Sequence, residues 1–215
     1  MKVGVLGSGD VGKVLVAGFV KRGHQVMIGT RDSEKLGEWL AQNPPAKTGS
    51  LAEAAGFAEV VVLAVKGTAA LDAVWAAGAA NLAGKTVIDA TNPIADAPPV
   101  NGVLTFFTEQ NESLMERLQG ALPEVHFVKA FNSVGNPLMI HPQFPGGIKP
   151  TMFICGNDEA AKQTVRGILD QFGWETADMG QVEAARAIEA LCKLWLIPGF
   201  TRNEWNHALK LLRPN

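Results

Sequence analysis

The chain has 215 residues, of which 47% are hydrophobic and 19% charged, and its formal net charge is −2. This composition is typical of a globular protein and excludes a disordered or fibrous chain. Basic and acidic residues are interspersed, so no basic stripe indicates a nucleic-acid-binding surface. The most apolar stretch, 57–65, contains Glu59 and is too short to span a bilayer. We therefore expect neither nucleic acid nor a membrane among the partners.

Cysteine, histidine and tyrosine usage narrows the chemistry further. Cys155 and Cys192 form neither a disulfide framework nor a metal-binding spacing, and the four histidines are scattered. We expect no metal site. The chain runs from Met1 directly into an apolar strand, which predicts a cytoplasmic protein without a signal peptide. It contains no tyrosine, which excludes every mechanism that needs a tyrosine acid.

Short β-rich apolar runs alternate with helical patterns along the first two thirds of the chain. Strands are expected at 2–6, 25–29, 60–65, 86–89, 125–129 and 152–155. Helices are expected at about 11–22, 33–42, 51–56, 68–80 and 112–119. This alternation predicts an α/β fold with a doubly wound, mostly parallel sheet of the Rossmann type. The strands are almost continuously apolar, as expected for strands that are buried on both faces.

The last third of the chain continues with a helical stripe at 158–172 and a short strand at 174–177. A further helix should run from Val182 to Trp195 and end at Pro198. The sequence 201–204 has the pattern of a capping box and predicts a last helix to about Leu212. We expect a single domain, 1–215, in which 181–215 is a C-terminal helical extension. The aromatic residues of this extension predict a homodimer.

A glycine-rich loop follows the first expected strand. Its residues Gly7, Ser8, Gly9, Asp10, Val11 and Gly12 match the pattern G-x-G-x-x-G between a strand and a helix, the context in which this pattern binds a dinucleotide. The first glycine allows the tight turn, the second admits the pyrophosphate, and the third lets helix and strand pack closely. The helix N-terminus offers free N–H groups to the phosphates. A plain strand–helix turn is the alternative interpretation.

The end of the second strand predicts which dinucleotide is bound. An acidic residue at this point takes the ribose hydroxyls of NAD, whereas an arginine accommodates the 2′-phosphate of NADP. Here Thr30 can donate a hydroxyl, Arg31 a charge-assisted fork, and Lys35 a second positive charge. Asp32 lies one residue late for the ribose role. The pattern therefore favours NADP(H), with a solvated arginine in a turn as the alternative.

Five motifs in this order resemble the F420-dependent NADP reductase family, and also the cytosolic NADPH–flavin domain of the STEAP metalloreductases. They lie at 7–12, 29–31, 88–93, 128–132 and 154–157, and the resemblance extends over nearly the whole chain. It implies an oxidoreductase that transfers a hydride between the nicotinamide of NADP(H) and a small-molecule acceptor. That acceptor would be a deazaflavin (F420) or a flavin (FMN or FAD).

The resemblance also implies roles for single residues. Ser8 to Val11 would hold the pyrophosphate, and Thr30 with Arg31 the 2′-phosphate. Two further groups would border the ribose, the nicotinamide and the hydride-transfer site: Ala64, Val65 and Lys66, and then Asn92, Pro93, Ala130, Phe131 and Asn132. No catalytic residue is assigned, because hydride exchange between stacked rings depends on position more than on a protein acid.

Several alternatives stay open at this point. Asn132 is either a ligand-binding amide or a turn former, and Phe131 packs either on a ring or in the core. Lys129 is either a charge near the ligand or a solvated lysine, whereas Asp89 should accept backbone N–H bonds in the loop that follows it. A redox sensor without turnover is a second function. An imine or pyrroline-carboxylate reductase is a third, although only about 65 residues follow Pro150.

Overall fold

The computed structural model of the chain describes residues 1–214, with the exception of the Lys35 side chain. The strands are β1 (Lys2–Leu6), β2 (Gln25–Gly29), β3 (Lys47–Gly49), β4 (Val60–Leu63), β5 (Thr86–Asp89), β6 (His126–Lys129), β7 (Thr151–Ile154) and β8 (Glu175–Asp178). The α-helices are α1 (Asp10–Lys21), α2 (Gly37–Gln42), α3 (Leu51–Phe57), α4 (Ala70–Ala77), α5 (Ala79–Leu82), α6 (Leu114–Ala121), α7 (Glu159–Gln171) and α8 (Ala185–Arg202).

Within the described residues, the first six strands form one parallel sheet in the order β3-β2-β1-β4-β5-β6. The chain therefore winds outward from β1 in one direction and then from β4 in the other. A crevice opens where the two halves diverge, at the carboxyl ends of β1 and β4, and this is where such sheets bind ligands. The predicted doubly wound Rossmann-type fold is confirmed.

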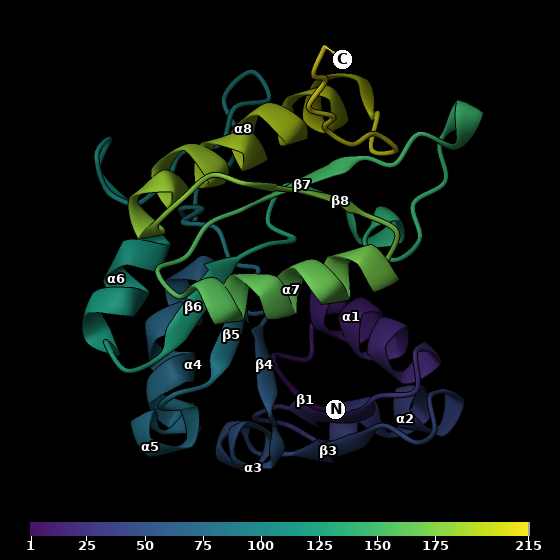
Figure 1. The fold of residues 1–215 in the computed structure, drawn as a ribbon, viewed down its shortest axis with the longest axis vertical. Coiled ribbons are helices and arrows are strands. Elements are labelled where there is room, and N and C mark those ends of the chain that lie inside the picture. Colours follow the sequence, from purple (N-terminus) through teal and green to yellow (C-terminus); the bar gives the residue numbers. More distant parts are fainter. Residues whose placement is uncertain (215) are drawn as a thin grey trace.

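Each face of this sheet is covered by its own hydrophobic core. Alternate residues of β4 show the division: Val60 and Val62 pack with α1 and α7, whereas Val61 and Leu63 pack with α3, α4 and α6. This alternation follows from the two-residue period of a strand, and both faces are apolar because both are covered by helices. Figure 1 shows α7 lying beside α1, with α3, α4 and α5 grouped elsewhere along the sheet.

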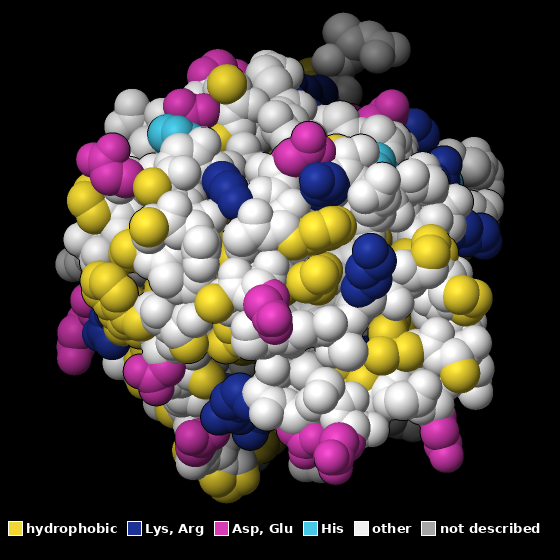
Figure 2. Space-filling model, turned by 90° about the horizontal axis from the view of Figure 1, so that it is seen from below, with side chains coloured by type: hydrophobic (Ala, Val, Ile, Leu, Met, Phe, Trp, Pro, Cys, Tyr) yellow, Lys and Arg dark blue, Asp and Glu magenta, His cyan; other side chains and the backbone are white. Residues whose placement is uncertain are grey.

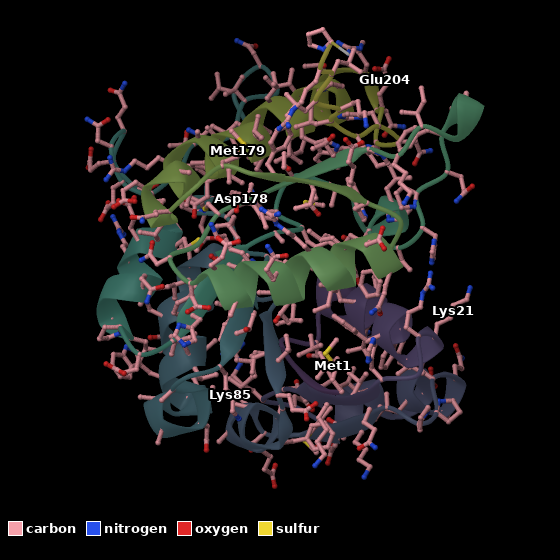
Figure 3. All side chains as sticks on the ribbon, in the orientation of Figure 1. Met1, Lys21, Lys85, Asp178, Met179 and Glu204 are labelled. Carbon is pink, nitrogen blue, oxygen red and sulfur yellow. The ribbon has the colours of Figure 1, made fainter. Side chains whose placement is uncertain are left out.

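The last two strands, β7 and β8, form a separate parallel pair. An antiparallel bridge between Lys129 and Cys155 connects this pair to the end of β6. In Figure 1 the pair lies between α7 and α8. Asp178 at the end of β8 forms ion pairs with Lys162 and Arg166 of α7, and Figure 3 shows it close to this helix. The pair therefore carries α8 across the carboxyl edge of the main sheet.

The structure corrects the expectation for the C-terminus. Helix α8 continues through Pro198 to Arg202, and the segment 203–214 is not helical. Asn203, in the left-handed conformation, ends the helix, and Figure 3 shows Glu204 beyond that end. Instead of the predicted capping contact, Thr201 donates its hydroxyl to the Ile197 carbonyl at 2.7 Å. The capping-box pattern was therefore misleading, because these four residues end one helix rather than begin another.

Contacts distant in sequence decide the course of this tail. The Thr151 N–H donates to the Leu209 carbonyl at 2.9 Å, so the tail runs beside β7. Trp195 and His207 stack at 5.0 Å and each donates a ring N–H to the other's backbone carbonyl at 2.9 Å. Local propensity is a weak prior, and such packing overrides it.

Two smaller differences concern the first half of the chain. Strand β3 was not predicted, because it has only three residues and lies at the sheet edge beside β2. The single helix expected at 68–80 is divided into α4 and α5 at Gly78, whose φ of 91° interrupts the helix.

The glycine contacts in the loop after β1 predict a contrast between two alanine variants. A Cβ at Gly12 would lie 2.1 Å from the Gly7 carbonyl oxygen, whereas a Cβ at Gly9 would have no atom within 4 Å. Gly12→Ala should therefore lower the free energy of unfolding by about 1–3 kcal/mol through overpacking. Gly9→Ala is the matched control and should melt within about 2 °C of the wild type, a change well under 1 kcal/mol. Equal melting temperatures for the two variants in thermal denaturation would contradict this contrast.

Candidate functional site

A cavity of about 470 Å³ opens at the carboxyl ends of β1, β2 and β4. It brings together three segments that are distant in the sequence: the glycine loop, the end of β2 and the turn that follows β4. Its lining consists of Gly7, Ser8, Gly9, Gly29, Thr30, Arg31, Leu51, Ala64, Val65, Lys66, Ala69, Asp72, Ala73 and Ala76. Eight of these residues were predicted from the sequence as cofactor-binding residues.

The backbone of the glycine loop shapes the floor of this cavity. Gly7 has a φ of +117°, and a Cβ there would lie 2.3 Å from the Ala64 carbonyl oxygen, so only glycine fits. Gly12 packs equally closely on Gly7. Gly9 is the N-cap of α1, and no side chain caps this helix end. The first N–H groups of α1 therefore remain available to an anion in the cavity.

Hydroxyl groups and one cation lie at the β2 side. The Ser8 and Thr30 hydroxyls are 3.0 Å apart, and the Thr30 oxygen also accepts the Asp32 N–H at 3.2 Å. Arg31 is exposed, and among the side chains that the structure describes it has no carboxylate partner. The Lys35 side chain, predicted to be a second cation, lies outside the described part of the structure. This end of the cavity therefore has hydrogen-bonding hydroxyls and a guanidinium that can accept an anion.

The opposite wall contains residues that the sequence analysis missed. Ala69, Ala73 and Ala76 lie at and along α4, and Leu51 begins α3. Asp72 adds the one carboxylate of the lining. The alanines repeat at intervals of four and three residues, which places them on one face of the helix. Alanines carry no polar or charged group that would mark a site, so the sequence analysis did not include them.

The other predicted site residues lie outside this lining. Asp10 is exposed, whereas Val11 and Gly12 are part of the helix behind the loop. Asn92 and Pro93 follow β5, and Ala130, Phe131 and Asn132 follow β6. The structure therefore separates the predicted residues into a cavity group on β1, β2 and β4 and a loop group on β5 and β6.

Two asparagines connect the loops after β5 and β6. The Asn92 side chain donates to the Asn132 carbonyl at 2.7 Å, and the Asn132 side chain donates to Asn92 Oδ1 at 3.1 Å. Asn132 also donates to the Ile188 carbonyl of α8 at 2.9 Å. Its Oδ1 is buried and accepts no hydrogen bond within the described residues. A buried amide oxygen without a donor is uncommon in folded proteins.

Phe131 does not face an open surface. Its φ is 62°, and its side chain is buried in the core with the Phe172 ring at 6.0 Å. Of the two roles that the sequence left open for this ring, the structure shows core packing.

A fully buried ion cluster lies beneath these loops. Lys129 Nζ is 2.6 Å from Asp89 Oδ2 and 2.7 Å from Glu189 Oε1, and it donates to the Thr91 carbonyl at 3.0 Å. Burial opposes the charge on Lys129, yet the two carboxylates outweigh it and raise the pKa of this lysine above its ordinary value. Burial raises the pKa of Glu189, with Lys129 opposing the change. Full burial excludes the solvated Lys129 that the sequence left open as one alternative.

Asp89 has the role that was predicted for it. Its Oδ1 accepts the Thr91 N–H at 2.9 Å and the Thr91 hydroxyl at 2.6 Å. The cysteines remain chemically quiet, because burial raises the pKa of both Cys155 and Cys192 to about 12.

The surface and the remaining side chains add two observations. On the face drawn in Figure 2, Lys and Arg side chains alternate with Asp and Glu, without a large area of one sign. In residues 1–214, His, Cys, Asp and Glu nowhere gather in a group of three that could hold a metal ion. Over the same range, every helix is too short or too polar to cross a membrane.

Comparisons with known proteins agree with this geometry. The family model described as NADP oxidoreductase, coenzyme F420-dependent, matches residues 2–93. A crystal structure from Arthrobacter sp. FB24, provisionally described as an F420-dependent NADP reductase, superposes with a TM-score of 0.93 at 34% identity and covers 99% of this chain and 100% of its own. The F420-dependent NADP reductase of Methanocaldococcus jannaschii is 29% identical over 90% of both chains.

A second group of relatives is longer than this chain. The metalloreductase STEAP3 of Rattus norvegicus is 29% identical over 93% of this chain, but the match spans only 38% of that relative's length. The expected NADP-dependent oxidoreductase is thus confirmed at the level of the family. With the match to the Arthrobacter structure over its full length, the chain belongs to the F420-dependent NADP oxidoreductase family.

Proposed function

We propose that this protein binds NADP(H) in the crevice and transfers a hydride between its nicotinamide and a deazaflavin or flavin ring. The observation that carries the proposal is the combination of an α1 N-terminus without a side-chain cap, open space above Gly9 and an Arg31 that has no carboxylate partner among the described side chains, all at one cavity. This combination fits a dinucleotide with a diphosphate and an additional phosphate on its ribose.

The residues present fit the parts of NADP(H) in order. The N–H groups of Gly9 and the first turn of α1 would hold the diphosphate, and a side chain at Gly9 would fill the space that the diphosphate needs. Thr30 and Arg31 would hold the 2′-phosphate. The apolar face formed by Leu51, Ala73 and Ala76 would cover the adenine.

The loops after β5 and β6 would bind the nicotinamide end of the cofactor. The buried Oδ1 of Asn132, which accepts no hydrogen bond in the described part of the chain, would accept from the N–H groups of a carboxamide. When bound, NADPH supplies the hydride and the flavin-type ring accepts it, so this chain's residues contribute position and exclusion of water. The chain contains no tyrosine, and a hydride transfer between two bound rings needs no tyrosine as a proton donor.

The first prediction concerns turnover. Purified protein under anaerobic conditions should oxidise NADPH when F420, FMN, FAD or riboflavin is offered, and should oxidise NADH much more slowly. Loss of absorbance at 340 nm follows the reaction. Tight NADPH binding without turnover of any of these acceptors would instead support a redox sensor.

The second prediction concerns Arg31. Arg31→Ala should weaken NADPH binding about 10- to 100-fold, because charge-assisted hydrogen bonds to a phosphate contribute about 1.5–3 kcal/mol. NADH lacks that phosphate, so its affinity should stay within about twofold. Titration calorimetry measures both constants.

Arg22→Ala is the matched control for this substitution. Arg22 is exposed at the C-terminal end of α1 and is not part of the cavity lining. It should leave both affinities unchanged. An equal loss of NADPH affinity in the two variants would point to overall charge rather than to a phosphate contact.

We also propose a homodimer through α8. Leu194 is 57% exposed and Phe200 is 43% exposed, both on this helix. Exposed apolar side chains that gather on one element are typical of protein–protein contacts. Light scattering at micromolar concentration should give about twice the mass of the chain, and Leu194→Glu should shift it toward the monomer. A wild-type monomer at that concentration would remove this part of the proposal.

A further inference from the structure

We infer that the buried triad of Asp89, Lys129 and Glu189 is a positioning group that orients the nicotinamide end of the site, an inference that rests on the proposed function. The three residues are at most 1% exposed and come from β5, β6 and α8. None of them lines the cavity, so they would act by holding the loops after β5 and β6 in place.

The first step is the fixing of Thr91. Lys129 donates to its carbonyl, while Asp89 accepts both its N–H and its hydroxyl. Every polar group of Thr91 is thereby bound to the triad. Because Asn92 follows directly, the start of its backbone is fixed in place.

The second step is the hydrogen bonding of Asn92 to Asn132, which fixes the position of Asn132. Asn92 and Asn132 exchange hydrogen bonds, and Asn132 also donates to Ile188, the residue before Glu189. On its other side, the Asn92 carbonyl packs on Gly67, where a Cβ would lie only 1.9 Å away. The unpartnered Oδ1 of Asn132 is therefore held in one orientation by contacts that trace back to the triad.

The third step explains why charged groups occupy this place. Glu189 also accepts the N–H groups of Leu114 and Met115 at 3.0 and 3.1 Å, so it caps α6 and ties it to Lys129. Lys129 forms ion pairs with Asp89 and Glu189 and donates a hydrogen bond to the Thr91 carbonyl. Buried ion pairs seldom add net stability over apolar packing. Their directional bonds do fix four segments relative to each other, which is what an oriented site requires.

The test compares the binding of NADPH with the binding of a fragment that lacks the nicotinamide. Glu189→Gln should weaken NADPH binding about tenfold. Binding of 2′-phospho-ADP-ribose, which lacks the nicotinamide, should stay within about twofold of the wild-type value. Titration calorimetry gives both dissociation constants without any acceptor or turnover. Glu189→Gln leaves Lys129 paired with Asp89, so no buried charge is stranded.

Glu116→Gln is the matched control. Glu116 forms the capping box of α6 together with Ser113, and it forms an ion pair with Arg186 of α8. No contact between Glu116 and the triad is found among the described residues. It should leave both constants unchanged. If Glu189→Gln shows no cooperative melt, Asp89→Asn gives the same test, because it leaves Lys129 paired with Glu189.

Three results would overturn the inference: equal weakening of both ligands, an unchanged NADPH constant, or the same selective loss in Glu116→Gln. Wild-type protein that binds neither ligand would contradict the proposed function itself, which keeps the two failures distinguishable.

Discussion

Close backbone packing across the carboxyl edge of the sheet is the constraint on which the rest of the structure depends. A Cβ at Gly12 would meet the Gly7 carbonyl, a Cβ at Gly7 would meet the Ala64 carbonyl, and a Cβ at Gly67 would meet the Asn92 carbonyl. The first contact joins α1 to the end of β1, the second joins the ends of β1 and β4, and the third joins the segments that follow β4 and β5. The series sets the width of the crevice, because any side chain at these glycines would push neighbouring strand ends apart.

Beyond β5, the segments are connected by side-chain hydrogen bonds and ion pairs rather than by close backbone packing. The asparagine pair connects the β5 and β6 loops, and the triad connects both strands to α6 and α8. Such a cluster is costly to break, since removal of one partner from a buried ion pair typically costs about 3–5 kcal/mol. The two kinds of contact together give an open cavity at β1, β2 and β4 beside tightly bonded loops after β5 and β6. That asymmetry suits a cofactor with phosphates at one end and a reactive ring at the other.

Much of the site could be predicted because its residues follow one another directly in the sequence. The glycine loop lies between β1 and α1, and Thr30 and Arg31 follow β2, so local pattern was enough to place them at the cavity. Asp89 was also predicted correctly, since its partner Thr91 is two residues away. The α4 wall was missed because small alanines carry no chemical pattern of their own. Glu189 was missed because its partners lie on β6 and at the start of α6, far from it in sequence.

The sequence by itself determined the doubly wound sheet, the strands from β1 to β6 except β3, and the part of the cavity lined by the glycine loop, Thr30 and Arg31. Apolar periodicity and glycine spacing are local properties, and each strand has to be apolar wherever two helical layers cover it. Tertiary structure alone decided the path of residues 203–214, the inward course of Phe131 and the burial of Lys129. In each case the deciding partner is distant in sequence: β7 for the tail, Phe172 for the ring, and Glu189 of α8 for the lysine. A buried charge or a strained backbone is stable only where such partners compensate it, and no local pattern records them.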